Sequence, residues 1–304
     1  MSSGTPVPLP TQAAARRLPR LPHRGRVALH VFLLGAALLW LFPLLWALYT
    51  SLRPYAETAE RGYVSPPGRL TLDNYAIAWR DGELLQHFLN TLVIVVPSVV
   101  LVLGLAAMLA FAVSRFSWGF NVALLMFFTA GNLLPPHVLI TPLFRLFLAL
   151  PVPPPLSDNG VLYDQHLGVI LAHVSFQLGF CTFVLSAYMK TIPQDILEAA
   201  RLDGASVGRL LRSIILPLSR PVIAALATLE ATWIYNDFLW ALVLMQTADK
   251  RPVTTALANL SGEFFTDHNV VAATAMLIAL PTLLLFLFLR RHFTRGLGLT
   301  SGGG

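Results

Sequence analysis

Two acidic residues, Glu230 and Asp237, lie inside a long apolar stretch of the sequence. A charge in the middle of a membrane costs about 2.5–3.5 kcal/mol on insertion scales, so each acidic residue there needs a reason. Trp233 and Trp240 alternate with them at steps of three and four residues, which places all four on one face of a helix. Carboxylates accept hydrogen bonds from hydroxyl groups, indole rings cover apolar C–H surfaces, and the neighbouring Asn236 can donate and accept. Because a sugar ring offers both kinds of surface, the pattern predicts a face that lines a path for sugars.

The same residues could instead have a structural role. They could tie helices together by hydrogen bonds, or, for Asp237 and Trp240, lie at the outer membrane interface. Glu230 and Asp237 could also serve as the proton sites of an ion-coupled secondary transporter. In another apolar run, His173 and Gln177 are one helical turn apart and share a face, so they could line the same cavity or simply pack inside the protein.

The composition places the chain in a membrane. Of its 304 residues, 56% are apolar and only 12% are charged, whereas a soluble domain carries about 25% charged residues. The apolar content excludes intrinsic disorder, and the lone Cys181 excludes a disulfide framework. The net charge of +6 is spread between apolar runs, which favours orientation in a bilayer and gives no reason to expect a nucleic-acid partner.

Six apolar runs reach the roughly 20 residues that a helix needs to cross a bilayer. They are Leu29–Tyr49, Phe88–Ala112, Phe120–Ile140, Leu167–Met189, Pro221–Leu244 and Val270–Leu289. Basic residues concentrate in alternate connections, including both chain ends, so both termini are predicted to be cytoplasmic. The predicted fold is an all-α polytopic membrane protein with six transmembrane helices.

Two domains follow from these runs: a disordered cytoplasmic arm over residues 1–26 and a transmembrane domain over residues 27–304. Two loops are predicted on the outer side. The loop Arg53–His87 could hold short helices against a soluble partner or be solvated without one. The proline-rich stretch Pro151–Gln165 is not expected to be helical.

The loop over residues 190–217 carries the sharpest local pattern. Gln194–Asp203 favours a helix, Gly204 suits the left-handed residue that ends it, and Ser206 can cap a second short helix. Pro217 is expected to stop or kink that second helix before the next span. The physical alternative is an ordinary amphipathic loop at the membrane surface.

This loop resembles the EAA motif of ATP-binding-cassette importer permeases, through Glu198-Ala199-Ala200, Gly204 and Ile214-Ile-Leu216-Pro217. Further stretches resemble the carbohydrate-uptake subclass, specifically the smaller permease subunit of maltose-type importers. They are Leu72-Asp-Asn-Tyr75, Asn90-Thr-Leu92, Pro135-Pro136, Trp233 with Asn236-Asp237-Phe238, and Arg295-Gly-Leu297. The insertion Pro151–Gln165 and the end Gly302-Gly303-Gly304 depart from that pattern.

The resemblance implies a type I importer permease fold in a bacterial-type cell membrane. It also implies that the loop couples the chain to an ATPase through Glu198, Ala199, Ala200, Asp203, Gly204 and Pro217. The implied partners are a second permease subunit, two ATP-binding-cassette ATPase subunits, an extracytoplasmic sugar-binding protein and membrane lipid. ATP and magnesium would be bound by the ATPase subunits, and this chain would bind no cofactor.

The sequence also argues against catalysis by this chain. A P-loop needs Gly-x4-Gly-Lys-Ser/Thr, and neither of the two lysines, Lys190 and Lys250, stands in that context. No His-Glu-x-x-His metal motif and no Gly-x-Ser-x-Gly nucleophile motif occurs. We therefore expect a transport subunit that is not an enzyme and holds no metal.

Overall fold

The computed structural model describes residues 23–116, 119–133, 135–259 and 267–297. It separates into two compact units, Met1–Trp46 and Ala47–Gly304. Helix α1 (His23–Ser51) begins in the first unit and ends in the second. Residues 1–22 of the predicted arm lie outside the described residues, and the helix begins four residues before the predicted boundary at Val27.

Four helices of the described chain are long and apolar enough to cross a membrane: Gly25–Ser51 within α1, α4 (Leu84–Arg115), α7 (His166–Lys190) and His268–Leu287 within α14 (His268–Leu297). They coincide with the first, second, fourth and sixth apolar runs of the sequence. The prediction of a helical multi-pass membrane protein is therefore confirmed. The count of six spans stays a prediction, because the third and fifth runs are interrupted.

The third run is two helices, not one. Helix α5 (Asn121–Leu133) has 13 residues, and α6 (Pro136–Ala149) has 14. Between them Pro135 is extended, with φ −61° and ψ 125°. A residue that precedes a proline is driven out of the helical region, and neither Pro135 nor Pro136 can donate a backbone hydrogen bond. The proline pair therefore divides the apolar run.

The fifth run is also divided. Helix α11 (Arg220–Tyr235) ends before Asn236, and a short helix α12 (Leu239–Leu244) follows. The Asp237 carboxylate accepts hydrogen bonds from the amides of Trp240 (3.4 Å) and Ala241 (3.2 Å), so it satisfies free N–H groups at the start of α12. The prediction of one continuous helical face from Glu230 to Trp240 is therefore wrong.

The main core of the second unit lies where α4 packs along α7, with α11 also against α4. Val102, Ala106 and Ala110 recur every fourth residue of α4, are each 0% exposed, and belong to this core. Such spacing puts them on one side of the helix, where two alanines let the neighbouring backbone come close. Leu185 of α7 is buried in the same cluster.

The predicted short helices of the first outer loop are present as α2 (Tyr55–Arg61) and α3 (Asp73–Asp81). The loop is tied to the start of α14, because the side-chain amides of Asn74 and Asn269 each donate to the Arg53 carbonyl over 2.8 Å. The Arg53 guanidinium, fully buried, donates to Glu57 (3.0 Å) and Ser65 (2.7 Å). A soluble partner for this loop stays a prediction.

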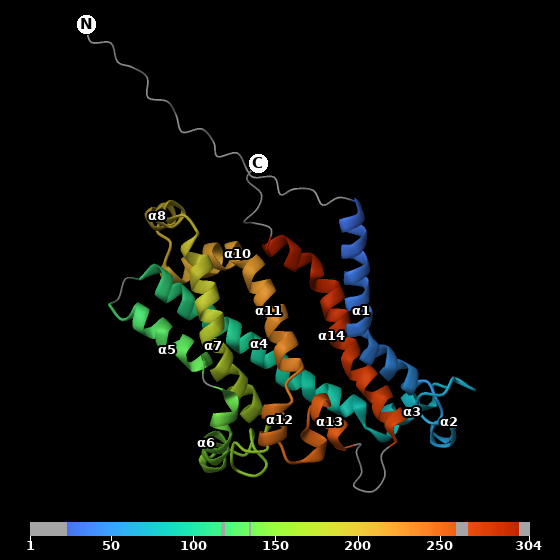
Figure 1. Ribbon diagram of the computed structural model, residues 1–304. Helices are drawn as coiled ribbons and strands as arrows, with labels where there is room; N and C mark the ends of the chain where they lie inside the picture. The colour runs from blue at the N-terminus through green and yellow to red at the C-terminus, as the bar shows by residue number, and fades with distance from the viewer. Residues whose placement is uncertain (1–22, 117–118, 134, 260–266, 298–304) are drawn as a thin grey trace. The chain divides into compact units, whose positions relative to one another are not determined.

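The remaining helical segments are α8 (Gln194–Leu202), α9 (Val207–Leu210), the π-helix η1 (Leu211–Ile215), α10 (Leu216–Leu218), the 3₁₀ turn η2 (Ala248–Lys250) and α13 (Val253–Asn259). Within the second unit, α8 and α10 lie at one end, whereas α6, α12 and α13 lie at the other (Figure 1).

The non-helical stretch Pro151–Gln165 is ordered at the end that holds α6 and α12. Pro151 and Val161 form an antiparallel bridge. The Asp164 carboxylate accepts hydrogen bonds from the Gln246 amide (2.7 Å) and the Thr247 hydroxyl (2.5 Å). The insertion is therefore fastened to the chain that follows α12.

Candidate functional site

The turn after α8 has the geometry that the sequence predicts. Gly204 has φ +79°, the left-handed region that glycine adopts without strain. The Ala205 amide donates to the Ala200 carbonyl over 2.9 Å, and the Gly204 amide donates to the Arg201 carbonyl over 3.0 Å. These two bonds form a Schellman motif, which closes the helix and reverses the chain tightly. Ser206 then caps α9 by accepting from the Arg209 amide over 3.4 Å, as predicted.

One face of α8 is anchored and the other is open. Leu197 is only 2% exposed and belongs to the main core, whereas Glu198, Ala199 and Asp203 are exposed. Two apolar side chains near them are also exposed, Ile196 by 43% and Leu202 by 89%. Exposed apolar side chains of this kind can mark a contact surface for another protein.

The second half of the loop, which includes α9, η1 and α10, packs against the core. Leu210 is 2% exposed and Ile215 is fully buried. Pro217 lies inside α10, after the π-helix η1, and the chain bends by 74° between Val207–Leu218 and Arg220–Tyr235. The bend therefore comes two residues after the proline that predicts it.

A hollow of about 640 Å³ opens where α11 ends. It is lined by His137, Leu229, Thr232, Trp233, Asn236, Asp237, Phe238 and Leu239. We call it the α11 groove. Trp233 is 57% exposed, so its ring is accessible. The groove contains three of the predicted path residues, Trp233, Asn236 and Asp237.

A second hollow of about 470 Å³ lies between α11 and α14. It shares Leu229, Thr232 and Asn236 with the α11 groove and adds Thr282 of α14. The Asn236 side-chain amide donates to Thr282 Oγ1 over 3.3 Å, so the polar groups of the two helices meet here. Sequence reasoning missed Thr232, Thr282 and His137. The spacing of Thr232 four residues before Asn236 is the one signal that pointed to it.

The two other predicted path residues on this segment are buried. Glu230 is 0% exposed, and its Oε1 accepts from the Cys181 thiol over 3.2 Å. Trp240 is 5% exposed and stacks on Phe176, with ring centroids 4.9 Å apart. The break after Tyr235 removes Trp240 from the face of α11, and the packing of α11 on α4 and α7 covers Glu230.

His173 and Gln177 of α7 are also interior, at 4% and 8% exposed. His173 Nε2 lies 3.7 Å from Asp237 Oδ2, so α7 contacts the break between α11 and α12. Of the two roles expected for His173 and Gln177, this position fits packing inside the protein. Among the residues that the structure describes, no three His, Cys, Asp or Glu side chains gather where they could hold a metal ion.

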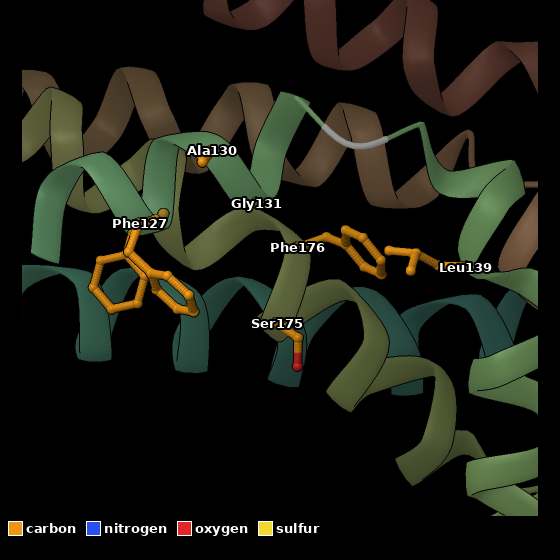
Figure 2. Close-up of a pocket in the computed structure, with 8 residues that line it drawn as sticks. Phe127, Ala130, Gly131, Leu139, Ser175 and Phe176 are labelled. Carbon is orange, nitrogen blue, oxygen red and sulfur yellow. The ribbon is translucent and has the colours of Figure 1, made fainter. Parts of the chain in front are cut away.

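A third hollow, of about 440 Å³, lies between α5 and α7 and is almost entirely apolar. Its walls are Phe127, Phe128, Ala130, Gly131, Leu139, Ser175, Phe176 and Gly179, and Figure 2 shows Phe176 beside Leu139. The Ser175 hydroxyl donates to the Leu171 carbonyl over 2.7 Å. Because its one side-chain hydroxyl is already bonded, this hollow is poorly suited to a polar ligand.

Comparison with known proteins gives consistent matches. A family model described as a binding-protein-dependent transport system inner membrane component matches residues 102–298. The osmoprotective compounds uptake permease protein GgtD of Synechocystis sp. is 31% identical over 279 residues, which cover 90% of each chain. The trehalose transport system permease protein SugB of Mycobacterium tuberculosis is 31% identical over 276 residues, covering 90% of this chain and 94% of its own.

The fold matches a solved structure as well. A chain of a bacterial ABC transporter involved in the import of the acidic polysaccharide alginate aligns with a TM-score of 0.74 and 21% sequence identity. The alignment covers 91% of this chain and all of that one. At this level of identity the likeness concerns the arrangement of the helices.

Proposed function

This chain belongs to the family of binding-protein-dependent transport system inner membrane components, and we propose that it is a permease subunit of an ATP-driven importer for sugars. The subclass is supported by relatives such as the trehalose system permease, to which the chain is similar over nine-tenths of its length. The features described above give this role two working parts, a coupling loop and a path.

The exposed face of α8 is the observation that carries the proposal. Glu198, Ala199, Asp203 and Gly204 are exposed on or beside a short helix, and Leu197 with the half-buried Ala200 holds this helix against the core. A partner can therefore grip the outer face, while the inner face transmits force. Glu198 offers a carboxylate to a basic group of that partner, and the Gly204 turn fixes the direction in which the chain leaves the helix.

Force would travel as rigid-body motion because the anchors are rigid. Leu197, Leu210 and Ile215 belong to the same buried cluster as the contact faces of α4, α7 and α11. Packed interiors shift between discrete arrangements and do not deform continuously, so a small swing at α8 is carried to the spans. Pro217 lies at the corner before α11, where the two segments meet at a bend of 74°.

The substrate path would run along the α11 groove. Trp233 offers an accessible ring, and Asn236, Thr232 and Asp237 offer hydrogen-bonding groups beside it. Sugars bind through this combination of an aromatic face and polar groups. His173 and Gln177 would support the groove from behind, through the contact between His173 and Asp237.

The proposed complex has further members. A second permease subunit would complete the path, two ATPase subunits would bind ATP and magnesium, and an extracytoplasmic binding protein would deliver the sugar. The binding protein would favour the outward-open state by binding it more tightly than the inward-open state. This chain contributes no catalytic residue to that cycle.

The test is purification of the importer in mild detergent, followed by identification of the associated chains and reconstitution into vesicles. We expect a co-purifying subunit with a P-loop, and sugar uptake that needs ATP and persists when ionophores remove ion gradients. Replacing Glu198 by Arg should release the ATPase subunit, whereas Glu198→Gln should weaken the association with that subunit to a smaller extent. Since Glu198 is exposed, both variants should keep their unfolding free energy within about 0.5 kcal/mol. Uptake driven by an ion gradient without the ATPase would refute the proposal.

A further inference from the structure

A groove with two arginines lies at the corner where the coupling loop joins α11. It has a volume of about 350 Å³ and is lined by Leu103, Gly104, Ala107, Met108, Leu211, Arg212, Leu216, Pro217, Arg220 and Ile223. We call it the corner groove. Its walls come from α4 on one side and from η1, α10 and the start of α11 on the other. No part of the coupling surface on α8 contributes to it.

The charge of the corner groove is unbalanced. Arg212 and Arg220 are both exposed, and neither guanidinium has an ion pair or hydrogen bond within the described ranges. No acidic residue is among the lining residues. Two free guanidinium groups at one groove favour an anion, and their planar donors match a phosphate well.

The rest of the corner groove is apolar. Leu103, Met108 and Ile223 contribute hydrocarbon surface, and Gly104 leaves a gap in the wall of α4. A Cβ atom built on Gly104 would meet no other heavy atom within 4 Å. A ligand that fits the whole groove therefore needs an anionic head and an apolar tail.

The position of the corner groove agrees with such a ligand. Val207–Leu218 is bent by 74° from α11, so it cannot run parallel to this helix across the bilayer. Arg212 lies on this bent segment and Arg220 is the first residue of α11, which places both at the end of the span where the coupling loop emerges. Basic pockets between helices on the cytoplasmic side are where anionic lipid head groups bind.

We propose that the corner groove binds one anionic phospholipid. Its phosphate would lie between Arg212 and Arg220, and one acyl chain would lie along α4 over Gly104 and Met108. The lipid would fill the corner through which α8 and α11 are joined. Bound there, it would stiffen the link between the coupling loop and the fifth span.

The test uses the importer purified with its associated chains in mild detergent. Native mass spectrometry would count retained phosphatidylglycerol and phosphatidylcholine as each is added. We expect phosphatidylglycerol to be retained in preference to phosphatidylcholine. Arg212→Gln and Arg220→Gln should each lower the affinity for phosphatidylglycerol about fivefold, since one basic residue near a membrane surface contributes about that much to the binding of an anionic lipid. Arg209→Gln is the matched control, because Arg209 is exposed on the same loop but does not line the groove.

A second variant tests the space independently of the charge. A Cβ atom at position 104 has open space around it, so Gly104→Leu should extend its side chain into the groove, favour the helix and prevent retention while both arginines remain. If the arginine variants fail to assemble, lipid retention by Gly104→Leu alone tests the proposal. Equal retention of the two lipids, unchanged retention in Gly104→Leu, or a partner chain cross-linked to both arginines would overturn the proposal.

Discussion

The thiol of Cys181 donates to Glu230 Oε1 over 3.2 Å, and both side chains are completely buried. The contact joins α7 to α11 within the core. Glu230 is fully buried, whereas Trp233, three residues further along α11, is 57% exposed. This position fits the alternative in which Glu230 ties two helices together.

We expect substitutions of Glu230 to alter stability and not substrate affinity. Glu230→Ala should lower the free energy of unfolding by about 2–4 kcal/mol, because it leaves a cavity and an unbonded thiol. Glu230→Gln retains the volume, so the sugar KM for uptake should stay within about twofold of the original. Thermal unfolding and an uptake assay measure the two effects. A tenfold rise of KM in the Gln variant, with unchanged unfolding, would place Glu230 in the path.

Trp233 should behave in the opposite way. Its ring is 57% exposed in the α11 groove, so Trp233→Ala should leave the unfolding free energy within about 0.5 kcal/mol. Loss of the stacking surface should raise the sugar KM by roughly five- to tenfold, because an aromatic contact contributes about 1 kcal/mol beyond its area. Trp233→Phe, which keeps a ring, should recover most of the affinity. An unchanged KM in the Ala variant would remove this groove from the path.

Gly204 and Gly208 form a matched pair for the coupling loop. Gly204 has φ +79°, where any other L-residue is strained, whereas Gly208 lies in α9 with open space around it. Gly204→Ala should cost about 1 kcal/mol locally and redirect the chain after α8, so transport should fall steeply while membrane insertion is retained. Gly208→Ala should transport normally. Equal behaviour of the two variants would show that the turn does not set the coupling geometry.

An ion pair on the Pro151–Gln165 insertion predicts a dependence on pH. Lys250 Nζ lies 2.6 Å from Asp158 Oδ2, and the hydrogen bonds from Lys250 and Gln165 lower the pKa of Asp158 to about 2. Since the usual value is about 4, this contribution to stability is complete above pH 4 and is lost as the pH falls toward 2.

The unfolding midpoint should therefore drop between pH 4 and pH 2, and Lys250→Met should flatten this drop. Because Asp158 is exposed, the change should be small. Asp164 should add to this loss of stability at low pH, because its pKa is also lowered. Burial would raise the pKa of Asp164, but hydrogen bonds from Thr247 and the Gln246 amide outweigh burial and lower it. Thermal scans of the original chain, Lys250→Met and Asp158→Asn measure the effect, and three parallel curves would contradict it.

Local patterns in the sequence predicted the coupling loop well. The helix predicted over Gln194–Asp203 is observed over Gln194–Leu202, and the left-handed Gly204 and the Ser206 cap are confirmed. Each of these features depends on a few adjacent residues. The role of the loop depends on another chain, so it stays a proposal. The prolines were harder to interpret. Pro135 and Pro136 break an apolar run that hydropathy presents as a single span, because hydropathy counts apolar residues and takes no account of the backbone groups that prolines leave unpaired.

By itself, the sequence determined that this chain lies in a membrane and where four of its spans run, because bilayer thickness translates directly into the length of an apolar helix. Only the tertiary structure decided which polar residues meet the α11 groove. Helical periodicity grouped Glu230, Trp233, Asp237 and Trp240, and the cap that Asp237 supplies to α12 separated them. A helical face ends where its helix ends. The burial of Glu230 and Trp240 against α7 depends on contacts between residues far apart in the sequence, with Cys181 and Phe176, which the spacing along the chain does not encode.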